Sequence, residues 1–127
     1  MKTWSGHIIF DDKFEWSKLE KAFPDIYSMV VENKKNPEDQ QFDQVMLQLN
    51  LEEMHKNKKP LGYIKDDAKY KLVFPLDRKE MILYRGVVSD EVREKTEEIE
   101  KILKSKKIRY TVDYDKMILY QIKKAKK

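Results

Sequence analysis

Apolar and polar residues alternate in two neighbouring parts of the C-terminal half of the chain. Tyr70, Leu72 and Phe74 alternate with more polar neighbours, and a second apolar run returns from Met81 to Val88. Alternation over a short run predicts a half-buried strand, and the charged turn between the two runs predicts a hairpin. The returning run carries apolar residues on both faces, which favours a central position in a sheet.

A helix and a second hairpin are predicted after this one. Residues 90–105 place Val92, Ile99 and Leu103 on one face and charged residues on the other, which is typical of an amphipathic helix lying on a sheet. Residues 108–123 then repeat the hairpin pattern, and the sequence Met-Ile-Leu-Tyr occurs at both 81–84 and 117–120. This repeat is explained either by chance convergence on a good strand composition or by duplication of a hairpin.

The N-terminal third predicts a strand and a short helix. The run from His7 to Phe10 has strand composition, and Phe14, Leu19 and Phe23 follow at helical spacing. Pro24 disfavours helical geometry at Phe23, so this helix is expected to end there. Residues 26–31 fit either a strand or a further helical piece, and their β-branched and aromatic content favours a strand.

A longer helix is predicted from Pro37 to Asn57. Asn36 can cap its start, and proline suits the first helical position. Its apolar residues form a stripe that is broad enough to be covered on more than one side, and we expect it to cover the second face of the sheet. The stripe consists of Phe42, Val45, Met46 and Leu49, widened by Leu47, Leu51 and Met54.

These elements predict a single domain, residues 1–127, of the α+β class. We expect a two-layer, mainly antiparallel sheet built from the hairpins 69–88 and 108–123 that flank the helix 90–105. The N-terminal strand and helices are expected to pack on this unit, with the strand added at an edge. If the helix 37–57 leaves the second face open, the strand tyrosines on that face become a candidate binding surface.

Composition narrows the classes of protein and site. The 127 residues include no cysteine, so disulfides, thiolate metal sites and cysteine nucleophiles are excluded. The N-terminus lacks the apolar core of a secretory signal, and no apolar run approaches the roughly 20 residues of a membrane helix. We therefore expect a cytoplasmic location and no membrane partner.

No pattern of catalytic, metal-binding or cofactor-binding residues is evident. The three glycines lie in separate places, which excludes glycine-rich phosphate loops, and no serine stands in a nucleophile-elbow context. His7 and His55 lie far apart and are each expected to be surface histidines. We expect no catalytic residue, metal or cofactor, which favours a protein that is not an enzyme without deciding the point.

Two stretches resemble nucleases. Pro24-Asp25 followed by Glu32-Asn33-Lys34 resembles the PD-(D/E)xK nuclease pattern, which implies a metal held by Asp and Glu, although the gap is shorter than the hairpin of that family. Residues 45–88 are similar to the small ribosome-dependent mRNA-cleaving toxins of bacteria, which use Lys, Arg and Tyr without a metal. The chain departs from them after residue 89, and the pattern assigns no family.

The leading hypothesis for the function is based on the lysine-rich segments. The chain has a net charge of +4, and cations concentrate after each of the two longer predicted helices. We expect a small non-enzymatic module that contacts nucleic acid or a nucleoprotein through these corners, with a salt-dependent affinity. The expected contacts are Lys56, Lys58, Lys59, Lys104, Lys106, Lys107, Arg109 and Tyr110.

Two alternatives remain open for the function. One is a protein-binding inhibitor or adaptor, of the kind carried by phage-like mobile elements, that acts on a host protein. It would use exposed aromatic residues such as Trp4 and Trp16, or the mixed-charge helix 90–105. The other is a small ribonuclease or nuclease. The oligomeric state, the identity of the partner, and the choice among DNA, RNA and protein do not follow from the sequence.

Overall fold

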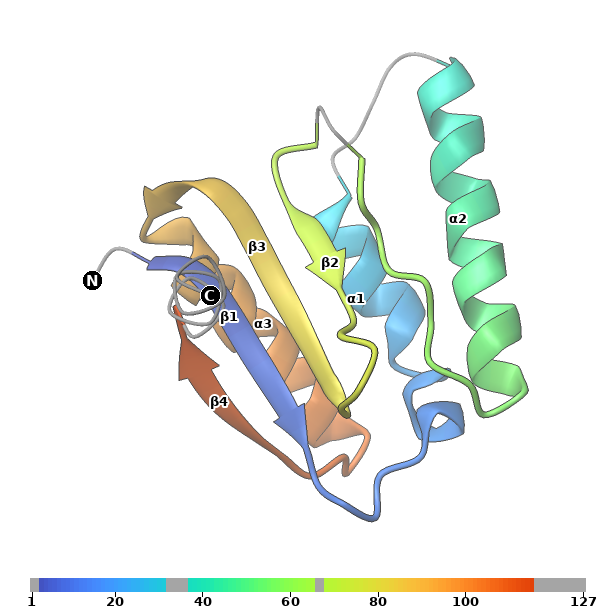
Figure 1. Ribbon diagram of the computed structural model, residues 1–127. Helices are drawn as coiled ribbons and strands as arrows, with labels where there is room; N and C mark the ends of the chain where they lie inside the picture. Colours follow the sequence, from blue (N-terminus) through green and yellow to red (C-terminus); the bar gives the residue numbers. More distant parts are fainter. Residues whose placement is uncertain (1–2, 32–36, 66–67, 116–127) are drawn as a thin grey trace, which may run out of the picture.

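The computed structural model describes residues 3–31, 37–65 and 68–115 of the chain. It has a small α+β fold in which a four-stranded antiparallel sheet, in the order β2-β3-β1-β4, is accompanied by helices (Figure 1). The elements are β1 (Thr3–Phe10), the 3-10 helix η1 (Trp16–Leu19), α1 (Phe23–Val30), α2 (Pro37–His55), β2 (Lys71–Val73), β3 (Glu80–Ser89), α3 (Glu91–Ser105) and β4 (Tyr110–Tyr114).

The first predicted hairpin and the helix after it are confirmed. β2 pairs with β3, and β3 is a central strand, as its apolar faces indicated. α3 covers nearly the predicted range, and its first N–H, that of Glu91, donates to Oγ of Ser89 at 3.0 Å. Of the second hairpin, β4 lies in the described part, whereas the second Met-Ile-Leu-Tyr copy and the strand expected there fall outside the described residues.

The position predicted for the N-terminal strand is wrong. β1 lies inside the sheet, between β3 and β4, and pairs with both along most of its length. Ile8 stands opposite Met81 on one side and Val112 on the other. The sequence of a single strand does not indicate which other strands it will pair with. Here β1 forms backbone hydrogen bonds to β3 of the first hairpin and to β4, and so joins them in one sheet.

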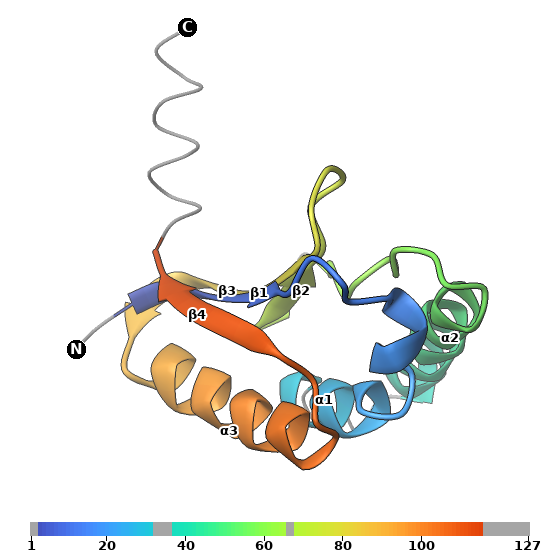
Figure 2. The same ribbon diagram turned by 90° about the horizontal axis from the view of Figure 1, so that it is seen from below.

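The main core lies between one face of the sheet and the helices α1 and α3. Both helices lie on the same side of the sheet (Figure 2). Ile8 and Phe10 from β1 and Leu83 from β3 point into this core together with Phe23, Ile26, Ile99 and Leu103 from the helices, all of them buried. α3 approaches β1 so closely that a Cβ added to Gly6 would lie 2.1 Å from Oγ1 of Thr96.

Of residues 26–31, for which a strand was favoured, 26–30 are helical and Val31 is extended. α1 begins at Phe23 with Pro24 in its first turn, where the missing N–H of proline has no helical partner to lose. Pro24 therefore starts a helix and does not end the one predicted before it, which is reduced to η1. The β-branched residues of α1 point into the core, because burial outweighs their weak helix propensity.

α2 has the predicted length but not the predicted orientation. It packs beside η1 and α1 at the side of the molecule, away from the second face of the sheet (Figures 1 and 2). Its fully or largely buried residues are Asp43, Asn50 and Met54, whereas Phe42, Val45 and Leu49 are 40%, 51% and 38% exposed. Two polar residues displace the apolar stripe from the core because they make specific buried hydrogen bonds.

Those buried hydrogen bonds come from two tyrosines and one glycine. The hydroxyl of Tyr27 donates to the carbonyl of Asp43 at 2.7 Å, and the hydroxyl of Tyr63 donates to Oδ1 of Asp43 at 2.9 Å. Asn50 is bonded to the backbone of Gly62 through both ends of its amide. Oδ1 of Asp43 and both ends of the Asn50 amide thereby have hydrogen-bond partners, as buried polar side chains usually do.

Candidate cationic interface

α3 ends in a backbone turn that presents two cations on either side of a buried isoleucine. The N–H of Ile108 donates to the carbonyl of Leu103 at 3.1 Å, and the N–H of Lys107 donates to that of Lys104 at 3.0 Å. This is the Schellman pattern, with Lys107 in the left-handed conformation at φ 59° and Ile108 in apolar contact with Leu103. Lys107 and Arg109 are exposed because only Ile108 turns inward.

α2 ends in the same way at the second predicted lysine cluster. Asn57 adopts φ 58°, and the N–H of Lys58 donates to the carbonyl of Glu53 at 2.8 Å. Oδ1 of Asn57 accepts the N–H of Ser17 at 3.2 Å, which ties this helix end to η1. Lys56 and Lys58 thus stand beside η1.

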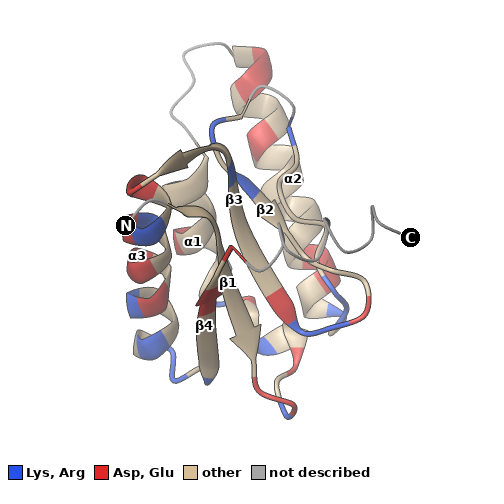
Figure 3. Ribbon diagram, turned by 60° about the vertical axis from the view of Figure 1, so that its left-hand side comes forward, with Lys and Arg blue, Asp and Glu red and all other residues tan. Residues whose placement is uncertain are grey.

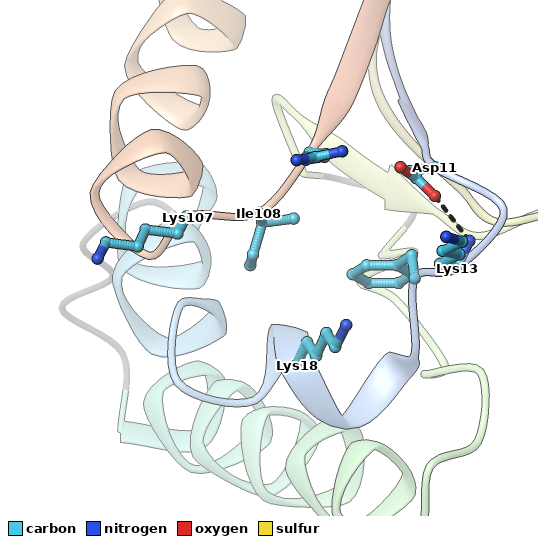
Figure 4. Close-up of a pocket in the computed structure, with 7 residues that line it drawn as sticks. Asp11, Lys13, Lys18, Lys107 and Ile108 are labelled. Carbon is cyan, nitrogen blue, oxygen red and sulfur yellow. Dashed lines mark hydrogen bonds between the residues drawn. The ribbon is translucent and has the colours of Figure 1, made fainter.

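A pocket separates η1 from the α3–β4 connection. It has a volume of about 240 Å³ and lies between two segments that are about ninety residues apart in the sequence. Phe14 and Ile108 contribute buried apolar walls, and Lys18 extends into the pocket from η1, whereas the amino end of Lys107 is turned outward (Figure 4). The lining residues are Asp11, Lys13, Phe14, Lys18, Lys107, Ile108 and Arg109. We call this the cationic pocket.

The cations of the pocket have little internal compensation. In the described part of the chain, none of its three lysines and its one arginine forms an ion pair with a carboxylate. Asp11 is the one acid in the lining, and its Oδ1 accepts the backbone N–H of Lys13 at 2.7 Å. Figure 3 shows basic residues at the end of α3 and the connection to β4. The pocket therefore carries excess positive charge.

Sequence reasoning found only half of this pocket. Lys107 and Arg109 were expected contacts, and Lys104 and Lys106 are exposed on the same helix end. Lys13 and Lys18 were missed because they are scattered among acids in a segment with no cluster of its own. Their proximity to Lys107 follows from the pairing of β1 with β4, which brings the ends of those two strands together.

The expected contact residue Tyr110 faces α3. Its hydroxyl donates to Oε1 of Glu100 at 3.0 Å, and its side chain is half-buried. Burial, followed by the hydrogen bond and the negative charge of Glu100, raises the pKa of Tyr110 to about 12. The ring therefore positions β4 on α3.

The strand tyrosines do not form one open platform. Tyr70 is buried on the helical side, where its hydroxyl donates to Oε2 of Glu91 at 2.7 Å. Tyr114 also faces α3, with the guanidinium of Arg93 4.7 Å from its ring centre. Tyr84 is opposite Ser5 on the other face of the sheet. Tyr120 lies outside the described residues.

His7 is buried, which corrects the expectation of a surface histidine. Its side chain is 1% exposed, whereas that of His55 is 80% exposed, as expected. Nδ1 of His7 is 2.7 Å from Oε2 of Glu80, and Nε2 is 2.9 Å from Oγ of Ser5. The spacing matches a serine–histidine–acid relay, but Ser5 is 0% exposed, so the relay ties β1 to β3 without access for a substrate.

Among the described residues there is no metal site of the kind that the nuclease resemblance implies. Asp25 is exposed in the first turn of α1, while Glu32, Asn33 and Lys34 lie outside the described part of the chain. No group of three or more potential metal ligands occurs among residues 3–31, 37–65 and 68–115. Within these same ranges, the helices lack the combination of length and apolar character needed to cross a bilayer.

Comparisons with known proteins give no relative from which a function could be transferred. No protein-family model matches the chain, and no curated protein or solved structure matches it at a significant level. A function is therefore inferred from the geometry and charge of the cationic pocket and its surroundings.

Proposed function

We propose that the protein binds the phosphate backbone of nucleic acid, with the cationic pocket at the centre of the contact. The observation that carries this proposal is that Lys13 and Lys18 line one pocket together with Arg109, with Lys107 at its rim. Lysines at a helix C-terminus alone are explained by the helix dipole. Lys13 and Lys18 do not end an α-helix, so the dipole does not account for them.

The surroundings of the pocket extend the same positive surface. Lys104 and Lys106 are exposed on the α3 side, and Lys56 and Lys58 are exposed beyond η1. A backbone carrying one charge per nucleotide can contact several such cations at once, which a single small anion cannot do. Contacts of this kind position a nucleic acid without reading its sequence. The supported class is therefore non-specific binding.

Salt dependence of binding tests this proposal. We expect fluorescently labelled 20-nucleotide DNA and RNA strands to bind at 50 mM salt and to dissociate steeply as salt increases. Each phosphate contact on a single strand contributes about −0.7 to the slope of log K against log salt, so Lys18→Ala with Arg109→Ala should lower its magnitude by about 1.4.

The matched control is Lys71→Ala combined with Lys101→Ala. It removes the same charge from β2 and from the exposed face of α3, and neither residue lines the cationic pocket. The control should keep the wild-type slope. Absence of binding at 50 mM salt, or an equal loss of slope in the two double variants, would overturn the proposed site.

A further inference from the structure

α2 exposes the apolar residues that its sequence pattern would place in a core. Phe42, Val45 and Leu49 are 40%, 51% and 38% exposed and are spaced three and four residues apart, so they share one face of the helix. We call these three residues the α2 stripe. The neighbouring face is the one that packs on η1 and α1 through Met54, Asp43 and Asn50.

The stripe is placed where another molecule can reach it. α2 stands at the outer side of the molecule, with η1 and α1 on one flank only (Figures 1 and 2). Residues 60–65 run beside it, because Gly62 is bonded to Asn50 and the ring of Tyr63 is 6.4 Å from that of Phe42. Leu61 and Ile64 in this segment are also exposed, at 49% and 60%. Exposed apolar side chains that gather on one side of a helix are typical of an interaction site.

The distribution of charge along α2 is that of an interface. In a chain with 39% charged residues, positions 44–51 contain none, and the centre of the stripe lies within them. Depletion of charge at the centre and enrichment at the rim are typical of the core and rim of a protein interface. Glu38 and Asp39 begin the helix, Glu52 and Glu53 lie near its end, and Lys56 follows it. Asp39 is paired with Lys65 of the same chain at 2.7 Å, which leaves Glu38 as the acid of the seam.

This distribution of charge indicates which molecule binds the α2 stripe. We propose that the α2 stripe is the interface between two copies of this chain, whose α2 helices pack antiparallel. In that arrangement Glu38 of each copy faces Lys56 of the other, whereas a parallel arrangement would oppose Glu38 to Glu38 and Lys56 to Lys56. A two-fold symmetric contact must be self-complementary, and a Glu38–Lys56 pair that is repeated at both ends of the seam meets that condition.

The spacing of the residues defines the register. Glu38, Phe42, Val45, Leu49, Glu52 and Lys56 follow the alternating three- and four-residue spacing of a helix–helix seam. With the two-fold axis at position 47, Val45 faces Leu49 of the second copy and Glu38 faces Lys56 of the second copy. Phe42 then packs along the aliphatic stem of Glu52 of the second copy. The interface does not include the cationic pocket, and Lys56 is the residue that it shares with the positive surface around that pocket. Sedimentation without nucleic acid therefore tests the interface separately.

Sedimentation velocity over a concentration series tests the dimer with the full-length chain. We expect a monomer–dimer equilibrium for the wild type and an increase in Kd of ~100-fold or more for Val45→Glu, which buries a charge in the seam against Leu49 of the second copy. Gln44→Glu is the matched control. It adds the same charge at the adjacent exposed position, outside the seam, and should leave Kd within about twofold.

Charge reversal tests the register separately. Lys56→Glu should weaken the dimer by roughly tenfold, and adding Glu38→Lys in the same chain should restore it, since each contact then has the opposite polarity. Circular dichroism and thermal unfolding establish that each variant is folded. A wild-type chain that stays monomeric up to ~1 mM, or equal effects of Val45→Glu and Gln44→Glu, overturns the interface. Failure of the double reversal to restore Kd overturns the antiparallel register.

Discussion

Asn50 and Gly62 are joined by two hydrogen bonds that imitate a pair of strand residues. The N–H of Gly62 donates to Oδ1 of Asn50 at 2.7 Å, and Nδ2 of Asn50 donates to the carbonyl of Gly62 at 3.0 Å. Nδ2 also donates to the carbonyl of Met46 at 2.7 Å. This side chain therefore fastens the segment after α2 to the helix, and it occupies a position where a helix of this pattern would otherwise bury a hydrophobic residue.

We predict that Asn50→Ala lowers the free energy of unfolding by about 2–4 kcal/mol, because it leaves the buried N–H and carbonyl of Gly62 without partners. Urea denaturation followed by circular dichroism measures this change as a lower midpoint. Gln48→Ala, at an exposed position of the same helix, is the control and should change the value by less than about 0.5 kcal/mol. Equal midpoints for the two variants would contradict the structural role of Asn50.

Because Gly6 lies close to Thr96, we predict that the effects of substitutions at these two positions on stability are coupled. A Cβ at position 6 would lie 2.1 Å from Oγ1 and 3.0 Å from Cβ and Cγ2 of Thr96, so Gly6→Ala should cost about 1–3 kcal/mol through overpacking. Thr96→Ala removes two of the three clashing atoms, so the double variant should recover at least about 1 kcal/mol relative to the sum of the single changes.

Gly86→Ala provides the control for that cycle. A Cβ there meets no atom within 4 Å, so the substitution should be neutral or stabilising by up to about 0.5 kcal/mol. Thermal or urea unfolding of the four chains of the cycle gives the coupling energy. Strict additivity of Gly6→Ala and Thr96→Ala would contradict the packing of α3 on β1.

Glu91 predicts how stability changes in acid. Hydrogen bonds from the hydroxyl of Tyr70 and the ammonium group of Lys69, with the positive charges of Lys69 and Arg85, lower the pKa of Glu91 from 4.5 to about 2. A lowered pKa in the folded state means that the contribution is present above pH 4.5 and is lost as the pH falls toward 2.

Urea unfolding of the wild type and of Glu91→Gln between pH 6 and pH 2 measures this contribution. The difference between their unfolding free energies should shrink as the pH falls through that window, and it should be small because Glu91 is half-exposed. Glu94→Gln is the control, since it removes a carboxylate from the same helix without touching Tyr70, Lys69 or Arg85. A difference that is constant with pH would show that the contacts of Glu91 do not depend on its charge.

The sequence by itself determined the elements whose apolar spacing is regular. The alternation in 70–88 and the one-sided stripe of 90–105 predicted β2, β3 and α3 because local periodicity must match the one buried face of each element. It also located both lysine-rich helix ends, since cations favour the negative end of the helix dipole. The α+β class follows from these elements.

Only the tertiary structure decided the position of β1, the helical state of residues 26–30 and the orientation of α2. β1 takes its place by hydrogen bonding to strands more than seventy residues away, and no local pattern encodes which strands those are. α2 turns Asp43 and Asn50 inward because Tyr27, Tyr63 and Gly62 satisfy them there. The same long-range pairing brings Lys13 and Lys18 beside Lys107 and Arg109, since a charged site assembled from distant segments exists only once the strands between them have paired.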